Sequence, residues 1–496
     1  MIGHLIDGLM LMLNWASLLA VLVGLVAGIV VGALPGLTAT MAVAILAPFT
    51  FFMRPEIGIP FLLAIFKSAV WAGSISAITI ATPGTAAAAA VTLDGYAMAR
   101  RGETRRALEL SLFSSVTGDM LATIGLIFAA TWLATVALRF APPEFVVLYL
   151  IALLTISSVA GRSFPKAMIA TGAGFLIAMI GLDPMSGQTR FTFDSYLLTG
   201  GIEFIPLLIG LFALGEVLAD AERTARREAA AIGTSRGEPG VTLREYFSYA
   251  PTMLRSTGIG FFIGILPGIG AEIACWLSYG LGRRFAREPA KYGSGSPEGV
   301  VAAETGANAA CPGDLIPMMV FGIPGDTVTA VLLGAFMAQG LTPGPMLFER
   351  HATLVYGIFA MLLVSNVMLL GVGLIAIRWA RGIASIPRAI LHPIVIACAF
   401  AGSYAVNSSA FDLVVTAVGG ILGWMMRRAD VPVAPMVIAM LCAPGLENAL
   451  RQSLLLSDNG LLIFVSRPVS GAMLAVVGLV LLAFLVIRLR RRAAPA

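Results

Sequence analysis

Long apolar runs without charges are the feature that most constrains the fold of this chain. Residues 8–53 contain no Asp, Glu, Lys or Arg, and further apolar runs of about 20 residues, the length that crosses a bilayer, follow along the chain. Charged residues make up 12% of the sequence and hydrophobic residues 58%, whereas soluble domains carry about 25% charged residues. We therefore predict an all-α polytopic membrane protein embedded in a lipid bilayer.

The basic residues predict how the chain crosses the membrane. They gather between apolar runs, in clusters at residues 100–106, 223–227, 283–287 and 488–492. The positive-inside rule places such clusters in the cytoplasm, and the apolar runs between them predict roughly 12–14 transmembrane segments. The net charge of +5 is explained by these clusters, so it does not indicate a nucleic-acid partner.

A short motif occurs twice, and each copy ends an apolar run. GALPGLTATM begins at Gly32 and GILPGIGAEI begins at Gly264, and small residues precede both copies at four-residue spacing. Such spacing gives a flat helix face that another backbone can approach closely in a membrane. One such face is common, but two in register indicate related halves. Four residues are therefore predicted as structural hinges at matching helix breaks: Pro35, Gly36, Pro267 and Gly268.

A second pair of stretches supports two related halves of opposite orientation. The stretches are WAGSISAITIATPGTAAAAAVTLDGYAMA at 71–99 and CPGDLIPMMVFGIPGDTVTAVLLGAFMA at 311–338. The basic loop follows the first stretch but precedes the second. We predict two inverted-topology repeats, at 1–219 and 250–496, joined by a cytoplasmic linker at 220–249. Transporters built this way bind substrate near the membrane midplane at discontinuous helices.

The Pro-Gly pairs in these stretches predict re-entrant, broken helices and a substrate site. Proline cannot continue a helix interior and glycine accepts a sharp reversal. Unpaired backbone groups at membrane depth are tolerated only inside protein or against a wet cavity, and helix N-termini favour carboxylates. The predicted substrate-binding residues around the breaks are Gly73, Ser74, Ser76, Thr82, Pro83, Gly84, Thr85, Asn308, Pro324, Gly325, Asp326 and Thr327. The alternative for each hydroxyl is a hydrogen bond to its own helix.

Lys67 is a predicted substrate ligand of a different kind. It is the one charge in an apolar stretch, and an ammonium at membrane depth is costly and usually paired or functional. The functional interpretation is a counter-charge to a substrate carboxylate. The alternatives are an internal ion pair, with Asp314 or Asp326, or snorkelling to the membrane interface.

Other acidic residues divide between ion binding and structure. Glu272 and Asp314 are predicted cation ligands, for a sodium ion or a proton. Glu304 is a further candidate, with a solvated position near a loop as the alternative. Asp94, close to the cytoplasmic arginine cluster, is predicted to act as a structural ion-pair or cap residue.

Several function classes lack their sequence signatures. The chain has no GxxxxGK[ST] motif, no HExxH and no CxxC. Its four cysteines are scattered and its three histidines lie far apart in sequence. We predict no catalytic residues, no metal site, no bound cofactor and no enzymatic activity.

Two longer stretches carry a family resemblance. The first is AGSISAITIATPGTAAAAAVTLDGYAMARRGETRRAL, and the second runs from PEGVVAAETGANAACPGDLIPMMVFGIPGDT to AQGLTPGPMLF. With the GxLPG motifs, they resemble the large permease subunit of the tripartite tricarboxylate transporters, the TctA-type family, through nearly the whole chain. The resemblance implies a multi-pass secondary carrier of the bacterial inner membrane that imports organic anions, usually carboxylates, by symport with Na+ or H+. It also implies two partners, a small four-helix membrane subunit (TctB-like) and a periplasmic solute-binding protein (TctC-like).

The sequence departs from the family pattern around the predicted pocket. Ala72, Ala81 and Ala307 replace the expected glycine and asparagines, and Lys67 and Asp314 are charged where small residues are expected. These departures bear on the substrate more than on the fold. The predicted mechanism is elevator-type alternating access, in which the two Pro-Gly hairpins move with the substrate. The alternatives are rocking of two rigid halves, and an autonomous carrier or channel that needs no binding protein.

Overall fold

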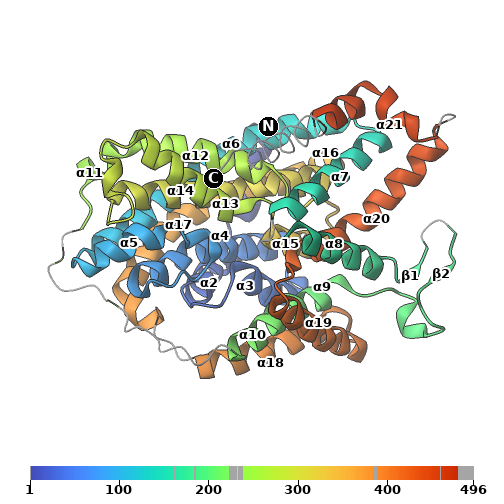
Figure 1. Cartoon of the computed structure of the whole chain (residues 1–496), viewed down its shortest axis with the longest axis horizontal. Coiled ribbons are helices and arrows are strands. Elements are labelled where there is room, and N and C mark those ends of the chain that lie inside the picture. The colour runs from blue at the N-terminus through green and yellow to red at the C-terminus, as the bar shows by residue number, and fades with distance from the viewer. Residues whose placement is uncertain are drawn as a thin grey trace, which may run out of the picture.

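The computed structural model describes residues 2–159, 163–183, 186–222, 232, 238, 240–384, 388–457, 460–476 and 478. Helices dominate this part of the chain (Figure 1). Its one sheet is a two-stranded antiparallel ribbon, β1 (Gly181–Leu182) and β2 (Thr189–Arg190), with Gly181 opposite Arg190.

The first half of the chain contains ten α-helices and four shorter helical segments in the described residues. In chain order these are α1 (Ile2–Met12), α2 (Trp15–Gly32), α3 (Ala39–Leu46), η1 (Ala47–Phe52), α4 (Pro55–Ile80), η2 (Ala86–Ala88), α5 (Val91–Arg100), α6 (Thr104–Ala137), α7 (Pro142–Val159), α8 (Phe164–Ala178), η3 (Tyr196–Leu198), α9 (Phe204–Leu208), the π-helical η4 (Ile209–Leu214) and α10 (Gly215–Glu222).

Half of the predicted linker at 220–249 lies outside the described residues, and α11 (Leu243–Ser248) lies within its C-terminal part. The second half of the chain begins there. Its elements are α11, α12 (Ala250–Ile265), α13 (Gly270–Phe285), η5 (Pro289–Lys291), α14 (Pro297–Phe321), α15 (Thr327–Ala338), α16 (Pro345–Arg350), α17 (Ala352–Ala384), α18 (Arg388–Asn407), α19 (Ala410–Arg428), α20 (Val433–Leu455), η6 (Gly460–Leu462) and α21 (Ile463–Ser466).

Eight of the described helices are long and apolar enough to cross a membrane, and five shorter apolar helices of 10–17 residues accompany them. This confirms the prediction of an all-α polytopic membrane protein. The predicted 12–14 segments counted some of the shorter helices as full spans. The apolar stretch at residues 250–282, which Pro267-Gly268 interrupts, forms two separate helices of 16 residues each, α12 and α13.

The two halves repeat one order of elements. In each, a helix that ends just before a Leu-Pro-Gly (α2 or α12) is followed by a second helix (α3 or α13), a long buried helix (α4 or α14), a short helix (α5 or α15) and a very long helix (α6 or α17). The equivalent helices α6 and α17 run antiparallel, because Thr131 contacts Tyr356 at 2.8 Å while Asp119 contacts Asn366 at 2.8 Å. Antiparallel equivalents are what an inverted repeat requires.

The central helices α4 and α14 are each approached closely by a glycine-lined neighbour. A Cβ atom on Gly24 of α2 would lie 2.6 Å from the carbonyl oxygen of Phe61 in α4, and one on Gly264 of α12 would lie 2.9 Å from the backbone nitrogen of Asp314 in α14. No side chain fits in either gap. The glycine spacing therefore places α2 on α4 and α12 on α14 in the same manner.

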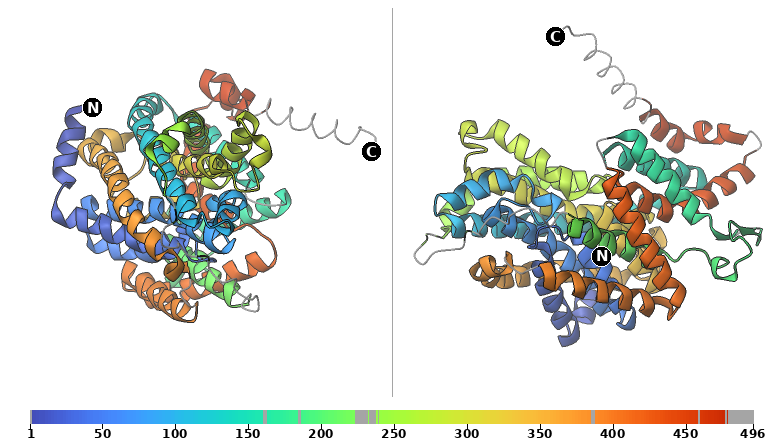
Figure 2. Two further views of the ribbon diagram at one scale, coloured as in Figure 1. Left: turned by 90° about the vertical axis from the view of Figure 1, so that its left-hand side faces the viewer. Right: turned by 60° about the horizontal axis from the view of Figure 1, so that its bottom comes forward.

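Helices late in each half pack on the other half. Figure 1 and Figure 2 show α20 beside α7 and α8, with which it is in contact, while α9, η4 and α10 contact α18 and α19. Hydrogen bonds fix the second contact: the Thr416 hydroxyl donates to the carbonyl of Pro206 at 3.0 Å, and Arg427 donates to the carbonyl of Leu211 at 2.8 Å. The two halves are therefore interlocked.

Candidate substrate site at the helix breaks

The break after α4 folds the chain back onto that helix. Ala81 ends α4 in a left-handed conformation, with φ of 57°. The Gly84 backbone N–H then donates to the carbonyl of Gly73 at 3.0 Å. A Cβ atom on Gly84 would collide with the carbonyl oxygen of Gly32, so the Pro83-Gly84 turn is wedged between α4 and the end of α2.

The break after α14 differs from the first break in that a capped helix, α15, follows it. Gly322 ends α14 with a φ of 68°, in the left-handed region that favours glycine. Asp326 then caps α15, because its carboxylate accepts from the Thr329 backbone N–H at 2.7 Å, and the Asp326 backbone N–H donates to the Thr329 hydroxyl at 2.7 Å. The Asp326 side chain is thus already engaged in a capping box.

The four Pro-Gly breaks meet within the molecule. The Gly268 N–H donates to the carbonyl of Gly325 at 2.5 Å, and the hydroxyls of Thr40 and Thr327 lie 2.7 Å apart. The segment η2, after the first break, contacts both α13 and α14. The structure therefore brings the predicted hinge residues and both predicted groups of site residues into one region.

A buried hydrogen-bonded chain joins the two central helices in this region. The Ser74 hydroxyl of α4 donates to the Glu304 carboxylate of α14, and the Asn308 amide donates to the other oxygen of that carboxylate at 2.9 Å. Glu304 is 1% exposed, so the alternative that it is solvated near a loop is wrong. The reason is that α14 is enclosed by α4, α6, α12 and α13.

Asp314 lies further along α14 than Glu304 and Asn308, beside the second break. It is fully buried, and a Cβ atom on Gly325 would lie 2.7 Å from its Cα. Within the described residues, neither of its carboxylate oxygens has a hydrogen-bond partner, and the same holds for Oδ1 of Asn308. Buried oxygens without donors have the chemistry to bind a cation or a proton. Glu272, the other predicted cation ligand, is exposed on the first turn of α13.

The remaining predicted hydroxyls bond to nearby backbone. Ser76 donates to the carbonyl of Gly73 at 3.3 Å, Thr82 to that of Ile80 at 3.4 Å, and Thr85 to that of Val70 at 3.5 Å. For Ser76 this is the alternative that the sequence left open, a hydrogen bond to its own helix. Thr82 and Thr85 lie beyond the end of α4, and Thr85 bonds back to that helix. Thr82 is also exposed, whereas Ser76 and Thr85 are buried.

Lys67 forms an internal ion pair, and its partner differs from both predicted ones. Its Nζ lies 3.0 Å from Oδ1 of Asp119 on α6, not beside Asp314 or Asp326. It also donates to the carbonyl of Leu362 at 3.1 Å and to the Ser365 hydroxyl at 3.2 Å. These contacts use all three ammonium hydrogens, so none is directed at a substrate in this conformation.

Asp119, Asn366 and Thr40 are the residues of this region that the sequence analysis missed. Asp119 left a usable signal, because it is a carboxylate inside the apolar run of α6 and intramembrane charges are usually paired. It is therefore the natural partner for Lys67. Thr40 and Asn366 left none, because single polar residues in apolar helices are common.

Asp94 confirms its predicted structural role. Its Oδ1 accepts three backbone hydrogen bonds, from Gly293, Gly295 and Ser296, each at 2.8 Å, and its Oδ2 accepts one from the Tyr279 hydroxyl at 2.8 Å. The carboxylate thereby anchors the loop before α14 to α5.

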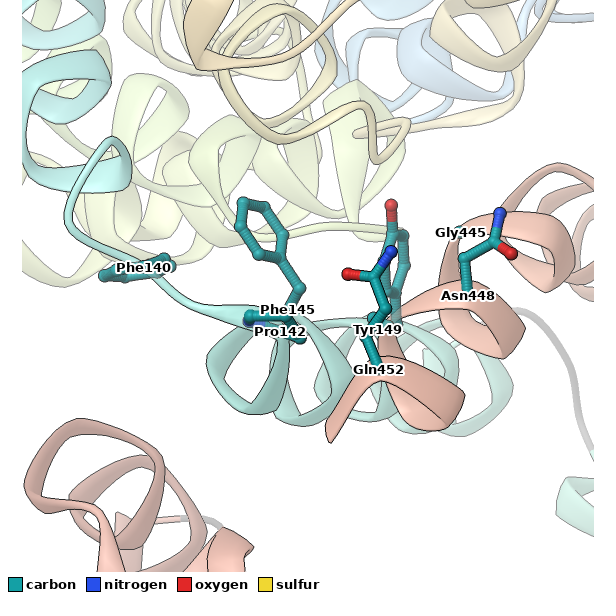
Figure 3. A pocket seen from close by; sticks show the side chains of 8 residues that line it. Phe140, Pro142, Phe145, Tyr149, Gly445, Asn448 and Gln452 are labelled. Carbon is teal, nitrogen blue, oxygen red and sulfur yellow. The ribbon is translucent and has the colours of Figure 1, made fainter. Parts of the chain in front are cut away.

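A pocket of about 350 Å³ lies away from the breaks, between α7 and α20 (Figure 3). Aromatic side chains of Phe140, Phe145 and Tyr149 and the amides of Asn448 and Gln452 line it. None of the predicted site residues is among its lining residues.

Comparison with known proteins agrees with the family resemblance. Residues 18–438 match the tripartite tricarboxylate transporter TctA family. An uncharacterized 52.8 kDa protein of Agrobacterium vitis, named for its position in the TAR-I ttuC' 3' region, is 34% identical over 455 residues, which cover 92% of this chain and 90% of the relative. A second uncharacterized protein of that organism, from the TAR-II ttuC' 3' region, is 34% identical over 43% of this chain and 89% of its own length. No solved structure matches the chain.

Proposed function

Because the chain belongs to the tripartite tricarboxylate transporter TctA family, we propose that it is the large membrane subunit of a secondary transporter that imports organic anions. The substrates are di- or tricarboxylates or related carboxylates. The chain acts in a bacterial inner membrane, with a small four-helix membrane subunit and a periplasmic solute-binding protein that delivers the anion. It catalyses no chemical reaction and needs no cofactor beyond its coupling ion.

The convergence of the four helix breaks carries this proposal. Each break interrupts a helix in an apolar chain, and such interruptions at membrane depth are stable only when buried in protein or facing a polar cavity. Here the breaks contact one another, through Gly268 with Gly325 and Thr40 with Thr327. The N-terminus of α13, next to a break, provides the positive partial charge that carboxylates favour, whereas that of α15 is already capped by Asp326.

The coupling ion is Na+ or H+, and the acidic side chains of α14 are the best candidates to bind it. Asp314 and the Oδ1 atom of Asn308 are buried acceptors that lack a donor within the described residues. A sodium ion takes oxygen ligands of this kind, and a proton would supply the missing donor. Either ion would neutralise Asp314, which otherwise carries an unpaired buried charge.

The transport step is an elevator-type movement of the two broken hairpins against a scaffold. The symmetric packing of α2 on α4 and of α12 on α14 supports a hairpin unit in each half. Rocking of two rigid halves is less compatible with the exchanged helices α9–α10 and α20, because each half contributes an element to the other.

Uptake by proteoliposomes tests the proposal. The chain and its small partner subunit are reconstituted together, and radiolabelled di- and tricarboxylates are supplied with and without the binding protein, under imposed sodium or proton gradients. Accumulation that requires the binding protein establishes the tripartite carrier and identifies the ion and the anion. Accumulation without it would favour an autonomous carrier, and gradient-independent equilibration would indicate a channel. Asp314→Asn is the matched variant, which should remove dependence on the gradient of the coupling ion.

A further inference from the structure

The Lys67 ammonium of α4 lies in a cage of oxygen atoms that two further helices contribute. The cage comprises Oδ1 of Asp119 from α6 at 3.0 Å, the carbonyl of Leu362 at 3.1 Å and the hydroxyl of Ser365 at 3.2 Å, both from α17. Lys67 itself belongs to α4. The helices α4, α6 and α17 contact one another pairwise, so the cage lies where they cross.

The cage is sealed from solvent and its charges cancel. The side chains of Lys67 and Asp119 are only 2% and 4% exposed. The Asp119 carboxylate also accepts hydrogen bonds from Asn366 at 2.8 Å and from Thr123 at 3.1 Å. A single unpaired charge in such a place is strongly unfavourable. The carboxylate therefore requires a positive charge of one unit beside it.

The atoms around the ammonium are those that bind alkali cations. A carboxylate, a backbone carbonyl and a hydroxyl are hard oxygen ligands, which suit s-block cations rather than transition metals. Asn366, which donates to Asp119, is fully buried, and its Oδ1 atom has no hydrogen-bond partner within the described residues. The protein has thus built a cation site and filled it with a side chain.

We propose that the Lys67 ammonium is a built-in monovalent cation, and that its removal leaves a binding site for a free alkali ion at the crossing of α4, α6 and α17. The consequence of this inference for transport rests on the proposed function. At this crossing the native carrier holds a cation that cannot dissociate. The ion that drives transport must then bind elsewhere, and Asp314 is a buried candidate whose carboxylate oxygens have no hydrogen-bond partner within the described residues.

Thermal unfolding of the purified chain in detergent tests the proposal without any transport assay. Wild type, Lys67→Ala, Lys67→Met and Lys67→Ala with Asp119→Asn are titrated with NaCl and with KCl against N-methyl-glucamine chloride at constant ionic strength. Lys67→Ala vacates the cage and keeps the carboxylate. Lys67→Met fills the space without charge, and the double variant removes both charges.

The proposal expects a saturable rise of the unfolding midpoint by several degrees for Lys67→Ala with sodium or potassium, because an ion that binds only the folded state stabilises it. The rise should be at least halved in Lys67→Met and absent in the double variant. Wild type should show no larger rise than Lys67→Met does, because any cation response that these two share comes from an ion site elsewhere in the protein.

Three results would overturn the proposal. Lys67→Ala could fold equally well in every salt, which would mean that a proton neutralises Asp119. It could respond to cations no more than Lys67→Met does, which would mean that the cage is not the site. Finally, it could fail to fold even in high sodium or potassium while the double variant folds, which would mean that no free cation replaces the ammonium. If wild-type proteoliposomes took up none of the tested anions, that result would instead count against the proposed function. It would not change the interpretation of these titrations.

Discussion

Asn366 of α17 donates a hydrogen bond of 2.8 Å to Asp119 of α6, near the middle of both helices. The two helices hold equivalent places in the two halves and run antiparallel, so this contact lies where the halves cross. Lys67 extends the contact to α4. We therefore expect α4, α6 and α17 to move as one body during transport.

The ion pair of Lys67 and Asp119 should be strongly coupled. Breaking a buried pair leaves one uncompensated charge and costs about 3–5 kcal/mol, whereas replacing both charges by neutral groups costs much less. Lys67→Met and Asp119→Asn should each lower the unfolding midpoint, and the double variant should recover most of the loss. Thermal unfolding in detergent measures all three.

The control for this cycle is Lys291→Met. Lys291 pairs with Glu288, but the two side chains are 64% and 62% exposed, and exposed pairs contribute about 0–1 kcal/mol. Additive effects of Lys67→Met and Asp119→Asn would contradict the coupling.

Glu304 should be needed for uptake more than for folding. Glu304→Gln keeps the size of the side chain and can still bond to Ser74 and Asn308, but it removes the buried negative charge. We expect a folded protein whose gradient-driven uptake falls by about tenfold or more, which corresponds to about 1.4 kcal/mol. Ser76→Ala is the matched control on the same helix as Ser74, because within the described residues the Ser76 hydroxyl bonds only to the carbonyl of Gly73. Full uptake by Glu304→Gln would exclude a role for the charge.

Two glycines of α12 should differ sharply in tolerance. A Cβ atom on Gly260 would lie 3.0 Å from Cβ of Ala309 and closer still to the carbonyl of Gly306, whereas one on Gly258 would meet nothing within 4 Å. Overpacking costs about 1–3 kcal/mol, so Gly260→Ala should destabilise the chain. Gly258→Ala should leave it unchanged or slightly more stable. Equal unfolding midpoints for the two variants would show that α12 can shift on α14.

The Asp94 anchor should control the loop before α14. Asp94→Ala leaves the backbone N–H groups of Gly293, Gly295 and Ser296 without their acceptor. Gly295 and Ser296 are buried, and each buried donor left unpaired costs about 1–3 kcal/mol. We expect faster proteolysis of the loop at residues 286–296 and a lower unfolding midpoint. Glu288→Gln, in the same loop, should change neither, since its ion pair with Lys291 is exposed. An intact loop in Asp94→Ala would show that the flanking helices hold the loop without the carboxylate.

The sequence was most informative where backbone geometry depends on residue type. Glycine spacing predicted which helix faces meet, and the Leu-Pro-Gly and later Pro-Gly pairs mark the ends of α2, α4, α12 and α14. These features are local, because proline cannot continue a helix and a side chain cannot enter the space that glycine leaves. Helix number was harder, since hydropathy does not separate a full span from a shorter buried helix.

The tertiary partners of buried charges were not predictable in the same way. Lys67 was recognised as anomalous, but its pairing with Asp119 depends on α4 and α6 lying side by side, and neither sequence spacing nor hydropathy gives that neighbourhood. Glu304 lies near the start of α14, close to a loop in sequence, yet four helices surround it. Charge burial is decided by the packing of elements that are far apart along the chain.

The exchange of α20 and of α9–α10 between the halves has a consequence for how the protein is made. The ribosome finishes α7 and α8 long before α20, the helix that covers them, has been synthesised. Until then those two helices must remain in the bilayer with an uncovered flank, where lipid, the translocation machinery or another membrane protein can occupy it. The C-terminal third of the chain therefore closes the N-terminal half, and a truncated translation product would be a substrate for membrane quality control rather than a half-transporter.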